Sequence, residues 1–471
     1  MLIISKDTMT TNHNEADDLT IKPLHYTLII DISIDDKLLK AESRIKLLNV
    51  GAEPVDRFQL LLNRGLNVTA IEYDKGDVSF TQRRDRFKDL NEMVVNTINV
   101  LLDKPLKAGD TVSMHVTYEG EISSYEDVFT YIKDRISEEY TLIRTDAFSY
   151  PVLGVMEFKQ LISLLPRQRV GFELKVSVPT GYKVANVGKL LSYVETDDKV
   201  TFTYVSKLPS WRIDIAVSEF NLLSDEALDL HVFALETDHI HAGRILRELM
   251  RGLRFYRGWF GDPAHWAGYT VIEVPEGWGS QADVTGMLLE AKSFRDEQRV
   301  ESLYHELAHL WNVTSGEKIP SRFLDEGFAT YLQLLAVREF FGENVFEEKL
   351  DRFRQRAVKM AEDNPILLEI PVASYGEYGV TDASYFVGAW VLYILHRVVG
   401  DRCFRDTIRT FLKRYRDKPA TLEDFKQTAL NICGTKVDRL LNEWLFGNKA
   451  IQYLKQNTPV EELLKIYNPH M

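Results

Sequence analysis

At 471 residues, the chain is longer than a single hydrophobic core usually serves, so two or more domains are expected. Its composition, 45% hydrophobic and 27% charged, is typical of a globular protein. A formal net charge of -13 argues against nucleic-acid binding, because neutralising phosphates requires a basic face.

The number of cysteines and the lack of long apolar runs indicate in which cellular compartment the protein resides. The chain has two cysteines, Cys403 and Cys433, and is large enough to be stabilised by burial, so no disulfide framework is implied. The first apolar stretch, MLII, is too short for a signal peptide, and no run of about 18 apolar residues follows. We therefore expect a cytoplasmic protein that does not bind a membrane.

The first half of the chain has the pattern of a β domain. Residues 1–18 are mostly polar and end in an acidic cluster, which predicts a mobile tail. From residue 19 to 222, apolar and polar residues alternate in runs rich in β-branched residues, such as HYTLIIDISID and FELKVSVP. Turn-like pieces such as NVGAEP separate these runs, so an N-terminal β domain is predicted over 19–222.

After residue 223 the pattern becomes mainly helical. The stretch AGRILRELMRGLRFYRGWFG repeats apolar residues every three or four positions and stops at Gly261. Further helical segments follow, each ending near glycine or a polar break. We predict an α+β multidomain protein, with a mainly helical domain over 223–448 and a C-terminal extension over 449–471.

The segment HELAHLWNV, residues 305–313, carries the strongest chemical signal. In a helix, residues four apart lie on one face, so His305 and His309 can offer two imidazole nitrogens to one metal ion. Glu306 lies one position further round, within reach of a water molecule on that metal. The alternative is that both histidines are ordinary semi-buried residues of an amphipathic helix.

A catalytic zinc ion needs a further protein ligand and one open position. The next long helical segment supplies a candidate in FLDEGFAT, the carboxylate of Glu326. Other hydrolytic chemistry on the same metal site remains open at this point, because fold and motif alone do not identify the substrate.

HELAHLWN followed by LDEGFATY resembles the aminopeptidase N family of zinc peptidases, the gluzincins with a thermolysin-like catalytic domain. The resemblance implies a saddle or sandwich of β-sheets before the catalytic domain, one zinc ion per chain, a peptide substrate and Glu326 as the third ligand. The connection between His309 and Glu326 is shorter here than is usual in the family. In YFVGAWVL the resemblance implies that Tyr385 stabilises the oxyanion.

Two departures from this family concern the free α-amine of the substrate. Where the family has a GAMEN-like segment, this chain has GSQAD, which aligns Ala282 with the amine-binding glutamate. A second amine-binding position aligns with Ile143, so Asp283 is the candidate replacement. The substrate-binding segment inferred from the resemblance comprises Gly279, Ser280, Gln281, Ala282 and Asp283.

Many relatives continue into a large helical domain that covers the active site, whereas this chain resembles a short form without it. The resemblance therefore implies either a more open site or a homo- or hetero-oligomer that closes it. The favoured function is an aminopeptidase-like zinc metallopeptidase with possible endopeptidase or leader-peptide processing activity. The alternatives are a catalytically silent scaffold of the same fold and a hydrolase of a non-peptide substrate.

Overall fold

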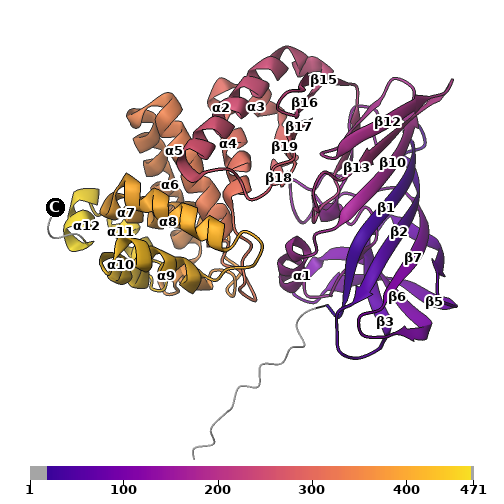
Figure 1. Ribbon diagram of the computed structural model, residues 1–471, viewed down its shortest axis with the longest axis horizontal. Coiled ribbons are helices and arrows are strands. Elements are labelled where there is room, and N and C mark those ends of the chain that lie inside the picture. The colour runs from indigo at the N-terminus through magenta and orange to yellow at the C-terminus, as the bar shows by residue number, and fades with distance from the viewer. Residues whose placement is uncertain (1–18, 468–471) are drawn as a thin grey trace, which may run out of the picture.

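The computed structural model describes residues 19–467, so the predicted tail at 1–18 lies outside the described residues. The strands up to β13 (Lys199–Val205), drawn in indigo to magenta, form the right side of the molecule, and the helices from α2 (Ala242–Phe260) onward, drawn in rose to yellow, form the left side (Figure 1). The expected α+β architecture, a β-rich N-terminal part followed by a mainly helical part, is confirmed.

The largest sheet has seven strands in the order β12-β13-β10-β1-β2-β7-β4. Their bounds are β1 (Ile21–Ser33), β2 (Leu38–Asn49), β4 (Leu66–Tyr73), β7 (Thr111–Gly120), β10 (Gly171–Pro179), β12 (Lys189–Glu195) and β13 (Lys199–Val205). β1 pairs in parallel with β10 and antiparallel with β2. Alternate residues of β1, including Tyr26, Leu28 and Ile30, are buried, which explains the period-two pattern of the sequence.

Two smaller sheets complete the N-terminal part, a four-stranded one in the order β5-β6-β3-β9 and a three-stranded one in the order β11-β14-β8. Their bounds, with those of one short helix, are β3 (Val55–Leu62), β5 (Val78–Phe87), β6 (Leu90–Leu106), β8 (Thr141–Ile143), β9 (Val152–Leu153), α1 (Phe158–Leu164), β11 (Lys183–Ala185) and β14 (Ile215–Ser218). Buried side chains from all three sheets, among them Leu60, Val116 and Ile215, share one hydrophobic core.

A five-stranded sheet in the order β15-β16-β17-β19-β18 begins the second part of the chain. Its strands are β15 (Phe220–Asp225), β16 (Leu230–Leu235), β17 (Tyr269–Val274), β18 (Gln281–Asp283) and β19 (Gly286–Glu290). The strands β16, β17 and β19 run parallel, and β18 pairs antiparallel with β19. β18 is thus an edge strand of this sheet.

The helices of the second part enclose a separate hydrophobic core. They are α2 (Ala242–Phe260), α3 (Ala291–Arg295), α4 (Glu301–Ala308), α5 (Phe328–Phe341), α6 (Glu343–Asp363), α7 (Ala389–Val399), α8 (Asp401–Arg414), α9 (Leu422–Cys433), α10 (Lys436–Trp444), α11 (Lys449–Gln456) and α12 (Val460–Tyr467). Ile451, Leu454 and Leu463 are buried in this core, so α11 and α12 are packed parts of the helical half.

Strand pairing suggests where the two domains divide. The boundary expected between residues 222 and 223 falls inside β15, which pairs with β16 of the second sheet. The preceding strand, β14, pairs with β8 of the N-terminal part. We propose that the boundary lies between β14 and β15.

The two cysteines differ from the expectation. Cys403 on α8 and Cys433 at the end of α9 form a disulfide, with their Cα atoms 5.8 Å apart. The sequence implied no disulfide framework, but the packing of α8 against α9 joins these residues, which are 30 positions apart in the sequence. None of the helices within residues 19–467 combines the length and apolarity needed to cross a bilayer.

Candidate active site

The two histidines of the HELAHLWN segment lie on one short helical stretch. α4 contains His305, and a turn of 3-10 helix at His309–Trp311 continues it. Leu303 and Leu307 are fully buried on the opposite face, so core packing fixes the rotation of the helix. The histidines consequently face the same side, as their spacing predicts.

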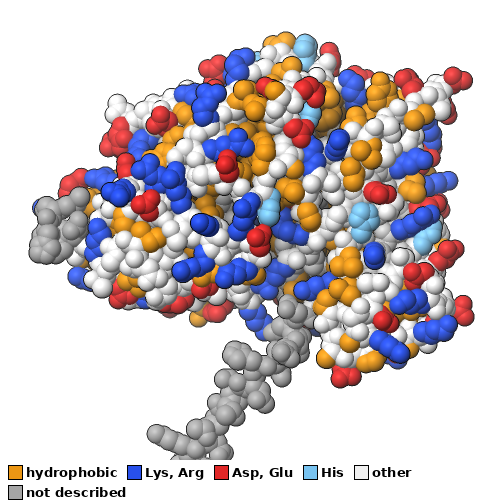
Figure 2. Space-filling model, viewed as in Figure 1, with side chains coloured by type: hydrophobic (Ala, Val, Ile, Leu, Met, Phe, Trp, Pro, Cys, Tyr) orange, Lys and Arg blue, Asp and Glu red, His pale blue; other side chains and the backbone are white. Residues whose placement is uncertain are grey.

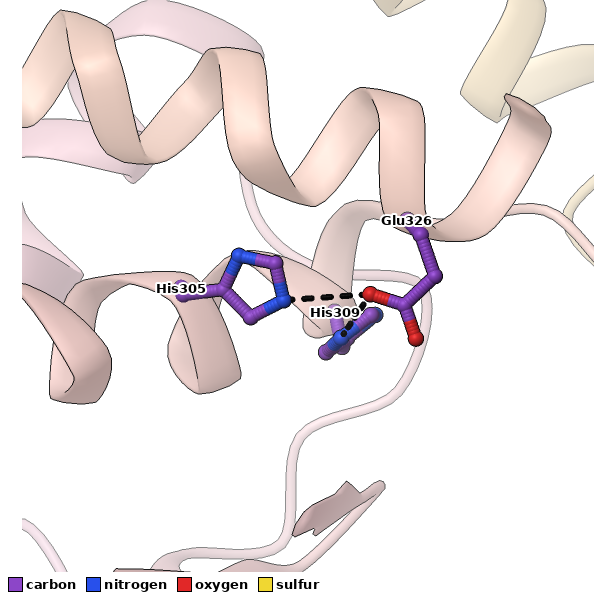
Figure 3. A group of neighbouring side chains, drawn as sticks. All are labelled: His305, His309 and Glu326. Atoms are coloured by element: carbon purple, nitrogen blue, oxygen red, sulfur yellow. Dashed lines mark hydrogen bonds and ion pairs between the residues drawn. The ribbon is translucent and has the colours of Figure 1, made fainter. Parts of the chain in front are cut away.

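Glu326 comes from a π-helical turn, Phe323–Gly327, immediately before α5. Its Oε2 atom lies 3.1 Å from Nε2 of His305 and 3.6 Å from Nε2 of His309 (Figure 3). One ligand atom from each of the three residues lies within 4.8 Å of the other two. Two imidazole nitrogens and one carboxylate oxygen form a donor set that suits zinc and leaves a coordination position open.

Burial brings His309, and neighbouring charges bring Glu326, into metal-binding protonation states, whereas the pKa of His305 is lowered by burial but raised on balance by Glu326. Burial opposes ionisation of Glu326, but the positive charge of Arg322 and the nearby histidines lower the pKa of its carboxyl. Burial lowers the pKa of His309 to about 4, so its imidazole is neutral at pH 7 and offers a lone pair. An ionised carboxylate and a neutral imidazole are the forms that ligate a cation.

Outer residues orient the two imidazoles. Nδ1 of His305 lies 3.2 Å from Oε1 of Gln333, which leaves Nε2 directed toward Glu326. Nδ1 of His309 lies 2.5 Å from Nδ2 of Asn312. Among the described residues, Oδ1 of Asn312 is buried without a hydrogen-bond partner.

Rotating the Asn312 amide by half a turn lets Oδ1 accept a hydrogen bond from Nδ1–H of His309. That tautomer leaves Nε2 unprotonated and free to bind a metal. The unpartnered Asn312 oxygen therefore supports the fit of a metal ion to these residues.

Arg322 is a functional candidate that the sequence did not reveal. Its backbone is left-handed, with φ of 67°, at the position just before the π-helical turn. The guanidinium donates from Nη2 to Oε1 of Glu326 and from Nε to Oδ2 of Asp325, at 3.0 Å in the second case. Arg322 therefore holds the oxygen of Glu326 that does not face the histidines. A basic residue four positions before a ligand is the only sequence signal, and it is weak.

Glu306 projects from the same helix as the two histidines and is 7% exposed. Burial raises the pKa of its carboxyl to about 7, and the negative charge of Glu326 adds to the increase. The positive charges of His305, Arg212 and Arg322 act in the opposite direction. A carboxyl with a raised pKa beside a metal-ligand cluster is suited to exchange protons near neutral pH.

Tyr385 reaches the cluster from a second π-helical turn, Ser384–Gly388, which precedes α7. Its ring lies parallel to the imidazole of His305, with the centroids 5.8 Å apart and an interplanar angle of 13°. Burial and the charge of Glu326 hold the pKa of its hydroxyl well above the usual value. Tyr385 therefore remains a hydrogen-bond donor at neutral pH.

The two π-helical turns touch at glycines. A Cβ atom on Gly388 would lie 3.0 Å from the Cα atom of Gly327. A side chain at this point would push the turn of Glu326 away from the turn of Tyr385. The glycine pair thus allows the third metal-ligand candidate and the tyrosine to lie side by side.

The two positions aligned with amine-binding residues do not supply a polar group. Ile143 is fully buried in β8, within the N-terminal core. Ala282 is half-buried on β18 and packs against the helical core. Asp283 already has partners, since its Oδ1 atom lies 3.2 Å from Nη1 of Arg169 and its Oδ2 atom accepts a hydrogen bond from Ser210.

Hydrogen bonds to Glu290 hold Gly279 and Ser280 of the GSQAD segment in place. Oε1 of Glu290 accepts a hydrogen bond from the backbone N–H of Gly279 at 2.9 Å. The hydroxyl of Ser280 accepts one from the backbone N–H of Glu290 at 3.1 Å. These contacts fix the approach of the chain to the edge strand β18.

Two buried arginines of the N-terminal part, which no sequence motif indicated, bind the side chain of Gln281. Oε1 of Gln281 accepts from Nη1 of Arg144 at 3.0 Å and from Nη2 of Arg212 at 2.6 Å. Its Nε2 atom donates to Asp146 at 3.2 Å. Arg212 also binds the carboxylates of Asp146 and Asp214, at 2.8 and 2.7 Å. These hydrogen bonds and ion pairs connect β18 to the N-terminal part of the chain.

Comparisons with known proteins agree with this geometry. Residues 269–444 match the peptidase family M1 domain. A leucyl aminopeptidase of Saccharolobus solfataricus is 23% identical over 300 residues, which cover 59% of this chain and 38% of that protein. Endoplasmic reticulum aminopeptidase 2 of Bos taurus is 20% identical over 474 residues, which cover 94% of this chain and 49% of that protein. The chain thus spans less than half the length of these two relatives.

Similar solved structures include M1 zinc metallopeptidases of Deinococcus radiodurans. One, a variant bound to a Tyr-Ser-Ala substrate, aligns with a TM-score of 0.66 at 20% identity. The alignment covers 90% of this chain and 94% of that one. The likeness therefore extends over both the sheet-rich and the helical parts of the fold.

Proposed function

We propose that the chain is a zinc-dependent metallopeptidase, because its residues 269–444 match the peptidase family M1 domain. The observation that carries the proposal is the convergence of His305, His309 and Glu326 within 4.8 Å. Glu306 and Tyr385 beside this cluster are the two further groups that peptide hydrolysis needs.

His305, His309 and Glu326 would hold the ion, which when bound acidifies a water molecule and polarises the scissile carbonyl. Glu306 takes a proton from the attacking water and later gives it to the nitrogen of the leaving amine. The hydroxyl of Tyr385 donates a hydrogen bond to the carbonyl oxygen as negative charge develops on it. Arg322 keeps the carboxylate of Glu326 in one orientation throughout.

The specificity we propose is aminopeptidase-like, extended to internal bonds. The curated relatives described above are named aminopeptidases, and the Deinococcus structure contains a tripeptide. In this chain, however, Ala282 and Ile143 cannot pair with a free α-ammonium, and the carboxylate of Asp283 is engaged by Arg169 and Ser210. Without a free anchor for the amine, a peptide can extend on both sides of the cut, so leader-peptide processing is a suitable role.

A defined peptide library, free and N-acetylated, tests this specificity when the cut bonds are located by mass spectrometry. We expect acetylated peptides to be cleaved and internal bonds to be included. If acetylated peptides are wholly resistant, free peptides lose single N-terminal residues and Asp283→Ala abolishes this trimming, Asp283 is the amine anchor and the endopeptidase proposal fails.

If the protein carries stoichiometric zinc but cleaves no peptide of the library, the proposal that it is a peptidase is wrong. A silent scaffold or a hydrolase of another substrate would then be favoured. Glu306→Gln, purified in the same way, is the matched control, because it should cleave the library at least about a hundredfold more slowly than the wild type.

Zinc content and compartment have their own tests. We propose one zinc ion per chain, and elemental analysis after zinc reconstitution should give a ratio near one. We also propose the cytoplasm as the compartment, although the disulfide between Cys403 and Cys433 is better suited to an oxidising one. Alkylating the thiols in freshly lysed cells decides this point, since two blocked cysteines per chain would indicate a reducing environment.

A further inference from the structure

The edge strand β12 of the seven-stranded sheet exposes apolar side chains on both of its faces. All seven of its residues, KLLSYVE, are exposed. Leu191, Tyr193 and Val194 are 57%, 63% and 61% exposed. Hydrophobic side chains gather over this strand in the space-filling view (Figure 2). Such a strand is a template for pairing with another chain unless something covers it.

The outer edge of β12 has no strand beside it within residues 19–467, because β12 is the terminal strand of its sheet. The strand contains no proline, which would cap an edge. A bulge at Leu191 shifts its register against β13, but Ser192 to Glu195 pair regularly. Ser192 to Glu195 therefore present a regular edge to which another strand can add.

The sequence of β12 is complementary to itself when read antiparallel. Centring two copies on Ser192 places Lys189 of one opposite Glu195 of the other. The same register pairs Leu190 with Val194 and Leu191 with Tyr193, so each apolar side chain meets an apolar one. A parallel arrangement would instead bring like charges together at both ends.

The charged ends are available for this pairing. Neither Lys189 nor Glu195 forms an ion pair within the described part of the chain. On the neighbouring strand, Lys199 is occupied by Asp31, with Nζ 2.6 Å from Oδ1. A two-fold axis through Ser192 would generate two Lys189–Glu195 pairs, one at each end of the interface.

We propose that β12 pairs antiparallel with β12 of a second copy of this chain, forming a two-fold homodimer with a continuous sheet across both subunits. Backbone hydrogen bonds along the two edges provide the affinity, and the alternating side chains fix the register. The proposal is independent of the peptidase activity, since β12 contains none of the residues assigned to the zinc site.

Charge reversal in a sedimentation experiment tests both the interface and its register. The full-length wild-type protein should show a concentration-dependent dimer. Lys189→Glu or Glu195→Lys alone should weaken the dimer about tenfold, because each variant converts two attractive pairs into repulsive ones. The double variant Lys189→Glu with Glu195→Lys should regain wild-type affinity, which only antiparallel self-pairing predicts.

Two further variants separate this interface from general surface effects. Leu191→Lys combined with Val194→Lys should give a monomer, whereas Lys40→Glu, on the exposed side of β2, should leave the dimer unchanged. A wild-type monomer at every concentration would overturn the proposal. The proposal would also fail if the double variant Lys189→Glu with Glu195→Lys did not regain the affinity lost in the single variants. It would fail as well if the variant Leu191→Lys with Val194→Lys still formed the dimer. Circular dichroism of each variant checks that the fold is intact.

Discussion

Arg322 binds one carboxylate oxygen of Glu326, while the other oxygen of that carboxylate lies 3.1 Å from Nε2 of His305. The arginine and the histidine thus divide the two oxygens of a single side chain between them. This division favours ligation through one oxygen, because the second oxygen is already hydrogen-bonded.

Arg322→Ala should weaken zinc binding by about 10- to 100-fold, the loss typical when a partner of a metal ligand is removed. Competition with a chelator measures this affinity independently of catalysis. Arg352→Ala removes an exposed arginine that pairs with Glu348 on α6, so it is the matched control. Equal zinc affinities in the two variants would show that Arg322 does not position Glu326.

Glu306→Gln should retain zinc and the fold but lose turnover by about 10²- to 10⁴-fold, because the amide cannot accept the proton of the attacking water. Steady-state kinetics together with elemental analysis separates this result from metal loss. Glu297→Gln, an exposed change before the same helix, should leave the rate unaltered. Full activity in the Glu306 variant would reject the mechanism.

Tyr385→Phe should lower kcat by about a hundredfold or more, because the ring still stacks on His305 while the oxyanion donor is lost. Zinc content and thermal midpoint should stay close to wild type. Tyr378→Phe provides a control, since that tyrosine is 52% exposed. Loss of stability with a normal specific activity would instead indicate that Tyr385 serves only in packing.

Glu273 on β17 should make the protein less stable as the pH rises. It is fully buried, and burial with the adjacent Asp238 raises the pKa of its carboxyl from 4.5 to about 9. The folded chain therefore binds a proton that the unfolded chain releases between these two values, so the free energy of unfolding falls as pH increases across this window.

Glu273→Gln should flatten this dependence, because the amide imitates the protonated carboxyl and can still accept a hydrogen bond from the backbone N–H of Leu235. The difference between variant and wild type should grow by roughly 1 kcal/mol per pH unit within the window. Denaturant unfolding from pH 6 to pH 8 measures it, with the exposed Glu276→Gln as control. Parallel pH curves would show that Glu273 is ionised in the folded state.

The parts of this molecule that follow from local geometry could be predicted from the sequence. His305 and His309 share a face because four residues make about one helical turn, and the alternation in β1 reflects one buried face of a sheet. Arg212 and Gln281 could not be paired in this way, since they are far apart in the sequence and meet only when β18 lies against the N-terminal sheets. The Cys403–Cys433 pairing similarly depends on how α8 and α9 pack.

Because the two π-helical turns contact each other, the geometry of the site depends on the number of residues in each turn as well as on their identity. Each π turn contains one residue more than an α turn, and one residue corresponds to about 100° of rotation about a helix axis. Deleting a single residue from Phe323–Gly327 or Ser384–Gly388 would therefore swing Glu326 or Tyr385 out of register with α4. A homologous chain that keeps the glycines but lacks one residue in either turn would therefore have a misaligned site.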